Sequence, residues 1–394
     1  MPVDGALGSH AVDGAGEDGP GPAPLCPHFG TCGGCAAQDL GDAAYRRWKR
    51  GFVEAALRRA RVEAEVAALV SVPPASRRRA RFFAERSASG LSLGFHARAS
   101  HEVVDMTACR VLEPGLFALT RPLKRYFRQT LDPGQGAEAE AQMVSGALDI
   151  LIRATGRLDL ERCQGLVDFA RRAGIARISW QGLGPGRRAR SGGRPRPSGA
   201  PQPPEVVAEL RPVTARFGGV AVALPPMAFV QASAAGEALI VDAVTTAIAR
   251  GTRVADLYSG AGTFTFPLAR GRKVAAFDGD EALIAALDAA ARGAGLGVQV
   301  TGTVRNLARR PLRSDELDGF DAVVMDPPRG GAPAQARQLA ASGVPLAVMV
   351  SCDPASFARD AKILMDGGFT PGLVLPVDQF VWTRHVELVA RFSR

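Results

Sequence analysis

The chain has 394 residues, of which 46% are hydrophobic and 22% charged, which suffices for one large domain or two and excludes a wholly disordered chain. Its formal net charge of +9 favours a phosphate-rich partner such as a nucleic acid. Codon bias is an alternative source of that charge, because only four of the 48 basic residues are lysine.

Residues 1–24 are expected to form a flexible tail. They contain no Lys or Arg and are rich in Gly and Pro. A secretory signal needs a basic start followed by an apolar run, and this segment has neither. No stretch of the sequence predicts a membrane helix. We therefore expect a cytoplasmic protein with no membrane partner, and no obligate protein partner is evident.

Residues 25–220 are predicted to form an α+β domain. The pattern indicates a helix over Tyr45–Arg61 and a strand over Leu91–His96. Residues 182–204 are crowded with Gly, Pro and Arg, which cannot pack a core, so we predict a mobile basic loop there. The chain has six cysteines, and in a cytosolic chain of this size metal ligation or catalysis is a better first interpretation than disulfides.

Short apolar runs alternate with helical segments over residues 221–394. This alternation predicts an α/β domain with an open, mostly parallel sheet of the Rossmann-like kind. Such sheets bind ligands beyond the carboxyl ends of their strands. The predicted strands are Val254–Tyr258, Val274–Phe277, Ala322–Met325, Leu346–Val350 and Leu388–Phe392, and a helix is predicted over Glu281–Arg292.

The sequence after the first of these strands reads Asp256-Leu-Tyr-Ser-Gly-Ala-Gly-Thr-Phe, which predicts a nucleotide site. Gly260 and Gly262 permit a tight turn and a close approach of backbone to ligand. Asp278 follows Asp256 by 22 residues, near the spacing at which an acid binds a ribose. The missing third glycine of the dinucleotide fingerprint favours S-adenosylmethionine over a nicotinamide cofactor. Asp326 with two rigid prolines also favours it, and a plain strand-to-helix turn is the alternative interpretation.

Cys352 lies just past the end of a predicted strand, on the ligand side of the sheet. A helix predicted near Pro354 would favour a thiolate at its N-terminus, which makes Cys352 a candidate nucleophile. An inert, buried cysteine is the alternative. Glu387 is the candidate general base, although a solvated strand carboxylate is common at such a position, and a structural role is an equal alternative for His385.

Five motifs in this order resemble the RNA 5-methyluridine methyltransferases, a class I S-adenosylmethionine-dependent family that acts on transfer RNA and 23S ribosomal RNA. The resemblance covers about residues 25–394. It rests on Phe229-Val-Gln231, Asp256-Leu-Tyr-Ser-Gly-Ala-Gly-Thr-Phe, Asp326-Pro-Pro-Arg-Gly-Gly, Ser351-Cys352-Asp-Pro with Arg359-Asp360, and His385-Val386-Glu387.

The resemblance implies Cys352 as nucleophile and Glu387 as proton acceptor. The residues that it implies around S-adenosylmethionine are Gln231, Tyr258, Gly260, Thr263, Asp278, Asn306 and Asp326. The chain departs from the family where relatives have Glu in place of Asp278, and it is expected to lack the N-terminal oligonucleotide-binding barrel of many ribosomal-RNA members.

Four of the cysteines form a further candidate site, in which Cys26-x5-Cys32-x2-Cys35 is followed at a distance by Cys109. Four thiolates suit either zinc or an iron–sulfur cluster, and the spacing alone favours zinc. The resemblance instead implies a [4Fe–4S] cluster, because ribosomal-RNA members carry it on Cys-Pro-x-Phe-Gly-x-Cys-Gly-Gly-Cys and a distant Cys. The remaining Cys163 is interpreted as structural.

The expected reaction is methylation of uridine carbon 5, most simply in 23S ribosomal RNA, through a covalent bond from Cys352 to carbon 6. The target base must be unpaired or flipped out. Basic groups at residues 46–50 and 77–81 are candidate RNA contacts, whereas Phe82, Phe83 and Phe95 favour core packing. The alternatives are a transfer-RNA uracil-5 enzyme, an exocyclic-amine methyltransferase that uses Asp-Pro-Pro, and a non-catalytic iron–sulfur RNA-binding module.

Overall fold

The computed structural model describes residues 21–183, 186–187, 196–197, 203–249 and 252–394. The predicted tail over residues 1–24 therefore lies almost entirely outside the described residues, and so does most of the predicted basic loop over residues 182–204. No helix in the described part of the chain is long and apolar enough to cross a lipid bilayer.

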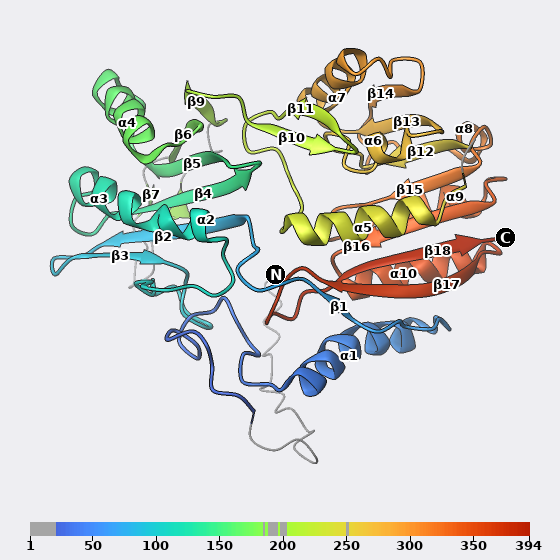
Figure 1. Cartoon of the computed structure of the whole chain (residues 1–394), viewed down its shortest axis with the longest axis horizontal. Helices are drawn as coiled ribbons and strands as arrows, with labels where there is room; N and C mark the ends of the chain where they lie inside the picture. The colour runs from blue at the N-terminus through green and yellow to red at the C-terminus, as the bar shows by residue number, and fades with distance from the viewer. Residues whose placement is uncertain (1–20, 184–185, 188–195, 198–202, 250–251) are drawn as a thin grey trace.

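The larger of the two main sheets runs through the C-terminal part of the chain (Figure 1). Among the described residues it has eight strands, in the order β1-β17-β18-β16-β15-β12-β13-β14. Neighbours from β14 to β16 are parallel, and β18 runs antiparallel to both β16 and β17. The strands are β1 (Val70–Ser71), β12 (Arg253–Leu257), β13 (Lys273–Asp278), β14 (Val300–Val304), β15 (Ala322–Met325), β16 (Leu346–Ser351), β17 (Thr370–Asp378) and β18 (Glu387–Ser393).

Alternating side chains of this sheet enter two separate cores, because successive residues of a strand point to opposite faces. In β12, Val254 belongs to one hydrophobic core, whereas Ala255 and Leu257 belong to the other. The first core includes residues of α5 (Ala234–Thr246), α6 (Thr265–Leu268) and α7 (Glu281–Gly293), and the second includes residues of α1 (Asp42–Ala60), α8 (Ser314–Leu317), α9 (Pro333–Ala340) and α10 (Pro354–Asp366).

The strand order reverses between β12 and β15, since the chain moves outward through β13 and β14 and then returns to the other side of β12. Ligands bind at such a switch point, beyond the carboxyl ends of the strands. This arrangement confirms the predicted open α/β sheet, and all five predicted strands are present. The sheet is mixed, because the last strand inserts antiparallel between β16 and β17.

The smaller sheet packs against α2, α3 and α4 around a third hydrophobic core (Figure 1). In the described part of the chain its order is β3-β2-β4-β5-β6-β9. Its elements are β2 (Arg79–Arg86), β3 (Leu91–Gly94), β4 (Gly136–Val144), β5 (Ala147–Thr155), β6 (Arg177–Leu183), β9 (Glu205–Glu209), α2 (Pro114–Ala118), α3 (Thr120–Thr130) and α4 (Leu160–Ala173). Short pairs add β7 (Gly186–Arg187) with β8 (Arg196–Pro197), and β10 (Thr214–Phe217) with β11 (Val220–Ala223).

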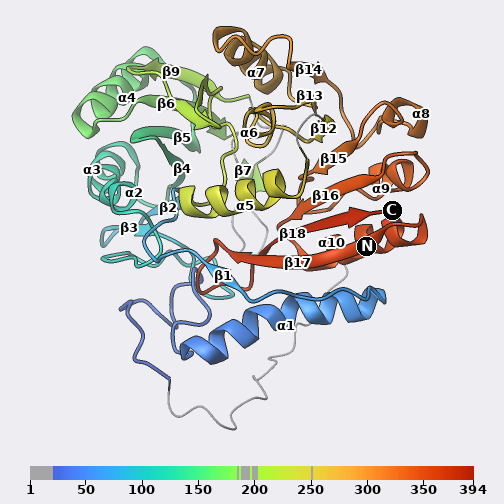
Figure 2. The same cartoon turned by 45° about the vertical axis from the view of Figure 1, so that its right-hand side comes forward.

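The packing of the cores does not follow the expected domain boundary at residue 220. Strand β1 pairs with β17, and α1 packs against the same sheet, although both precede the smaller sheet in the sequence (Figure 2). The β10–β11 hairpin also contributes to a core of the larger sheet. The N-terminal segment thus crosses to the C-terminal domain before the chain builds the smaller sheet.

Candidate active site

The predicted site residues converge at one edge of the larger sheet because they follow or begin adjacent strands. Tyr258 follows β12, Asp326 follows β15, and Cys352 follows β16. Glu387 begins β18, which runs in the opposite direction, so its first residue lies at the same edge. The sheet topology therefore brings together residues that are more than a hundred positions apart in sequence.

The turn after β12 forms a cradle of unusual backbone conformation. Tyr258, Gly260 and Gly262 all have positive φ, at 63°, 55° and 103°. The backbone N–H of Gly260 donates to Asp278 Oδ2 at 2.9 Å, which ties the turn to the end of β13. A Cβ on Gly262 would lie 2.6 Å from the Phe266 ring, so only glycine fits there. Asp278, the predicted ribose-binding acid, thus lies beside the predicted glycine turn in space.

Two other predicted cofactor residues lie in this turn or near it. Thr263 is partly buried within it, and Asn306 is exposed beyond the end of β14. A Cβ on Gly279 would lie 3.5 Å from Asn306 Cα, so the chain beyond β14 passes close to the end of β13. The Asn306 side chain accepts a hydrogen bond from the N–H of Arg309 at 3.1 Å.

Asp256, which begins the glycine motif but was not predicted as a site residue, is completely buried beneath the turn. Its Oδ2 accepts a hydrogen bond from the Thr265 hydroxyl at 2.5 Å, whereas its Oδ1 has no partner. Burial, with the charges of Asp326 and Asp278, raises its pKa to about 7. The sequence did contain a signal for Asp256, because it lies near the end of a predicted strand that leads into the glycine turn.

The pairing of β16 with β18 determines how Cys352 and Glu387 face each other. Ser351 pairs with Leu388, so the next step along this antiparallel register sets Cys352 opposite Glu387. Residues directly opposite in an antiparallel pair present their side chains on the same face. Glu387 is almost fully buried and its Oε2 has no hydrogen-bond partner, whereas Cys352 is partly exposed.

The thiol of Cys352 is not a stabilised thiolate in this structure. Helix α10 begins at Pro354, as predicted, and its N-cap Asp353 accepts the N–H groups of Ala355 and Ser356 at 3.0 Å. Burial, followed by the charges of Glu387 and Asp326, nevertheless raises the pKa of Cys352 to about 11. Burial and the two carboxylates thus act against the thiolate that the helix N-terminus was predicted to favour.

The carboxyl groups of Asp326 and Glu387 also have raised pKa values. Burial, then the charge of Glu387, raises the pKa of Asp326 to about 8. Burial raises the pKa of Glu387 to about 7, against a hydrogen bond from Gln379. Two carboxyl groups that share a poorly solvated site cannot both ionise easily, so near neutral pH the pair can hold a proton and also accept one.

Gln231 completes this polar group from the segment before α5. Its Nε2 donates to Asp326 Oδ2 at 3.3 Å, and its Oε1 accepts from Gln379 Nε2 at 2.8 Å. Gln231 and Gln379 are both buried. The sequence predicted Gln231 but gave no separate signal for Gln379, which is an ordinary glutamine at a strand end.

Comparison with known proteins identifies the family. No family model matches the sequence. The chain is 37% identical over 371 residues to an uncharacterized RNA methyltransferase of Mesorhizobium japonicum, covering 94% of this chain and 84% of that protein. It is 33% identical over 378 residues to the 23S rRNA (uracil(1939)-C(5))-methyltransferase RlmD of Halomonas elongata, covering 93% and 75%. This chain belongs to the RNA uracil-C5 methyltransferase family.

A solved structure supports the fold of this methyltransferase. The Pyrococcus abyssi tRNA (uracil-54, C5)-methyltransferase, solved with S-adenosyl-L-homocysteine, aligns with a TM-score of 0.67 at 23% identity. The alignment covers 91% of this chain and 85% of that chain. The class I S-adenosylmethionine-dependent methyltransferase fold predicted from the motifs is therefore confirmed.

Arginines at the start of β2 connect the smaller sheet of the methyltransferase to its active site. Arg78 donates from Nε to the Gln231 carbonyl at 2.9 Å and pairs with Glu237 at 2.6 Å. Arg79 donates to the Val230 carbonyl at 3.3 Å, and its guanidinium lies 4.6 Å from the centre of the exposed Phe229 ring. These predicted RNA contacts therefore have a structural role in holding the segment that carries Gln231.

A second predicted RNA contact, Lys49, has no exposed surface. Its Nζ lies 2.7 Å from Asp378 Oδ1 and also donates to the carbonyls of Phe380 and His385. The sequence did contain a signal for burial, because Lys49 shares the buried face of α1 with Tyr45 and Val53 at helical spacing. As predicted, Phe82 is a core residue, and it stacks on Phe95 with ring centres 5.8 Å apart.

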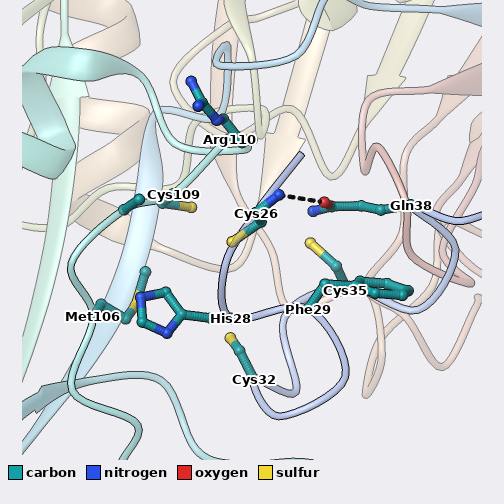
Figure 3. A pocket seen from close by; sticks show the side chains of 10 residues that line it. Cys26, His28, Phe29, Cys32, Cys35, Gln38, Met106, Cys109 and Arg110 are labelled. Atoms are coloured by element: carbon teal, nitrogen blue, oxygen red, sulfur yellow. Dashed lines mark hydrogen bonds between the residues drawn. The ribbon is translucent and has the colours of Figure 1, made fainter. Parts of the chain in front are cut away.

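The four predicted ligand cysteines line one pocket beside the smaller sheet, although Cys109 is distant in sequence. Figure 3 shows their sulfur atoms pointing toward one another. Burial, with the charges of the neighbouring cysteines, raises the pKa of Cys35 to about 11. Among the described residues, however, no three His, Cys, Asp or Glu side chains form a group that could hold a metal ion as they stand. A four-cysteine cluster is thus not shown by this arrangement.

Proposed function

We propose that this methyltransferase transfers a methyl group from S-adenosylmethionine to carbon 5 of a uridine in RNA, through a covalent bond between Cys352 and carbon 6. The observation that carries the proposal is the register of β16 and β18, which sets Cys352 opposite the buried Glu387 at the carboxyl edge of the sheet. Methylation of an exocyclic amine would need neither of these groups in this relation.

The cradle after β12 fits S-adenosylmethionine. The open space at Gly260, the carboxylate of Asp278 beside it, and the unpartnered Oδ1 of Asp256 beneath it leave polar groups available to a ligand. Tyr258 and Thr263 belong to the turn after β12, and Asn306 follows β14, so all three lie where the resemblance implies cofactor contacts. When bound, S-adenosylmethionine supplies an electrophilic methyl group.

The chemistry of uracil explains why both a thiol and a base are needed. The Cys352 proton passes to a carboxylate of the pair and on to solvent, and the sulfur adds to carbon 6, so that the ring electrons move toward carbon 5 and the carbonyl oxygen on carbon 4. Carbon 5 then takes the methyl group as the bond between that methyl group and the sulfur of the methyl donor breaks. Glu387 removes the remaining hydrogen of carbon 5 as a proton, the carbon 5–carbon 6 double bond re-forms, and the sulfur leaves.

The resemblance implies that Gln231 and Asp326 lie beside S-adenosylmethionine. Both side chains also fit the edge of the uracil ring. Uracil presents an N–H donor beside a carbonyl acceptor. A carboxyl oxygen can accept from the N–H, while the Gln231 amide can donate to the carbonyl on which negative charge develops. Their mutual hydrogen bond of 3.3 Å shows that both side chains reach the same point.

We propose ribosomal RNA as the substrate and a [4Fe–4S] cluster held by Cys26, Cys32, Cys35 and Cys109. The relative from Halomonas elongata, which is named for 23S ribosomal RNA, supports the substrate. The pocket supports the cluster, because the four cysteines line it together, and burial raises the pKa values of Cys32, Cys35 and Cys109, so that these thiols need a cation to stay ionised side by side. The cluster has no role in the methylation steps, so we expect it to organise the domain.

The test of the reaction is methyl transfer to ribosomal RNA taken from a strain that lacks the gene. We expect mass spectrometry of that RNA to show one missing 5-methyluridine, which the purified protein restores. Cys352→Ala should lower the rate by at least about 10³-fold, whereas Cys163→Ala should leave it unchanged. RNA with 5-fluorouridine at the target should form a stable adduct with the unaltered protein only. Activity of the Cys352→Ala variant would instead indicate amine methylation.

The test of the cluster is the iron and acid-labile sulfide content of protein purified without oxygen. We expect about four of each per chain, as a [4Fe–4S] cluster requires. Cys35→Ser should lose them, and Cys163→Ser should retain them. Bound zinc, or full iron content in Cys35→Ser, would contradict the assignment.

A further inference from the structure

We propose that Gln379 is a positioning residue that fixes the Gln231 amide and the Glu387 carboxylate for the reaction. Gln379 neither reacts nor, in this proposal, touches the substrate, and it acts through the two residues that do. The inference rests on the proposed function, since it assigns a role relative to the base and to the amide of the uracil site.

The hydrogen bonds of Gln379 carry the argument. An amide nitrogen has two N–H donors, and Gln379 Nε2 uses one on Gln231 Oε1 at 2.8 Å. The Gln379 amide also acts on Glu387, since it lowers the pKa of that carboxyl group against the effect of burial. The buried Gln379 side chain thus holds the acceptor end of Gln231 and stabilises the ionised form of Glu387.

The orientation of Gln231 depends on this contact. With Oε1 held by Gln379, the donor end of the amide must face Asp326, where it lies 3.3 Å from Oδ2. Without Gln379, Asp326 is the remaining described contact of the Gln231 amide, and a protonated carboxyl group can face either end of an amide. A rotated amide would place an acceptor against the Asp326 carboxyl and remove the donor that the uracil carbonyl needs.

The position of Gln379 is itself determined by contacts from two sides. Asp378, the preceding residue, is paired with Lys49 at 2.7 Å and accepts from the Tyr45 hydroxyl at 2.5 Å. On the other side, the buried Gly236 of α5 comes so close that a Cβ there would lie 2.6 Å from Gln379 Cβ. The corner between β17 and β18 therefore holds the amide with little freedom.

The experiment compares Gln379→Leu with Gln379→Glu, which keeps the length and polarity of the side chain but removes both donors. Single-turnover methylation of uridine-containing RNA is followed together with the fraction of protein trapped as an RNA adduct. Glu387→Gln is the reference, because loss of the base should let the methylated adduct accumulate. Gly236→Ala displaces the Gln379 side chain without changing its chemistry, because the added methyl group would press against Gln379 Cβ.

We expect both Gln379 variants to lower kcat by about 10- to 100-fold with little change in KM for RNA, and to accumulate adduct as the reference does. The rate should also reach its plateau at higher pH than in the unaltered protein, because Glu387 loses a hydrogen bond that favours its ionised form. The titratable groups that face Glu387 are Asp326 and Cys352, which are present in every variant. Gly236→Ala should show the same behaviour more weakly.

A folded Gln379→Leu protein with unaltered kcat and no adduct would overturn the proposal. So would a loss of rate without adduct while Glu387→Gln does accumulate it, since that outcome indicates a general structural defect. If Gln379→Leu does not fold, Gly236→Ala decides by the same two outcomes. Failure of the proposed function would be distinguishable, because Cys352→Ala would then remain active and Glu387→Gln would form no adduct.

Discussion

At the scale of single residues, burial changes what the carboxyl groups of this site can do. Asp326 and Glu387 would both be fully ionised at neutral pH in water, but here their pKa values are about 8 and about 7. The pair can therefore accept the Cys352 proton near pH 7 without extreme conditions. In the proposed reaction, the raised pKa of Cys352 makes this proton transfer necessary before the sulfur can attack carbon 6.

We predict that Glu387→Gln lowers the rate of methylation by about 10²- to 10⁴-fold, the usual contribution of a general base. In the unaltered protein the rate should rise with pH and level off above about 7, since only the deprotonated carboxylate accepts the carbon 5 proton. Quenched-flow assays across pH 5.5 to 9 measure both effects. Glu161→Gln, on the exposed surface of α4, is the matched control and should behave as the unaltered protein. A flat pH profile would count against Glu387 as the base.

At the scale of elements, α1 shows how a predicted helix acquires an unexpected partner. Its amphipathic pattern predicted a helix over Tyr45–Arg61, and the helix spans Asp42–Ala60. The pattern does not say which surface the helix covers. Packing places it on the larger sheet, where the backbone N–H of Ala36, just before the helix, also donates to the Trp382 carbonyl at 2.7 Å. The cysteine-bearing segment is thereby attached to the corner that leads to Glu387.

Lys49→Met should destabilise the protein by about 3 to 5 kcal/mol, because it leaves Asp378 buried without its cation. Adding Asp378→Asn should recover part of the loss, since the second change removes the uncompensated charge. Urea denaturation followed by circular dichroism measures the free energy of unfolding. Lys362→Met is the control, an exposed lysine on α10 whose loss should change stability by less than about 0.5 kcal/mol. Equal effects of the two substitutions would contradict a structural role for the buried pair.

At the scale of the whole molecule, the active site is maintained at a cost in stability. Three buried carboxyl groups have higher pKa values in the folded chain than the usual values that hold in the unfolded chain, namely those of Asp256, Asp326 and Glu387. They therefore bind protons more tightly when the chain is folded. Their contribution to stability is therefore greatest at low pH, near the unfolded pKa values of about 4, and is lost as pH rises through about 7 to 8. Ligands that bind near these groups can offset the loss.

We predict that the free energy of unfolding without ligands falls between pH 5 and pH 8, by about 1.4 kcal/mol per pH unit for each carboxyl group that is protonated only in the folded chain. Asp326→Asn should flatten this dependence, as its amide does not titrate. Urea denaturation at several pH values provides the comparison. An identical slope for the variant and the unaltered protein would show that Asp326 titrates normally in the folded state.

Local pattern was sufficient for much of the C-terminal domain. The strand β15 begins and ends where the apolar run predicted it, and β12, β13, β16 and β18 differ only at their ends. Runs of Val, Ala and Leu between turn residues are typical of buried strands. The glycine turn, Asp278 and Cys352 could be predicted for the same reason, because each lies at the end of such a run.

The sequence by itself determined the strands and the glycine turn and predicted the reactive groups that we propose, since these depend on residues adjacent along the chain. Only the tertiary structure decided which groups meet. The pairing of β18 with β16 sets Glu387 opposite Cys352, and the docking of α1 buries Lys49 against Asp378. Those contacts join segments that are not adjacent along the chain, and the resulting burial, which no local pattern encodes, shifts the pKa values on which the proposed chemistry depends.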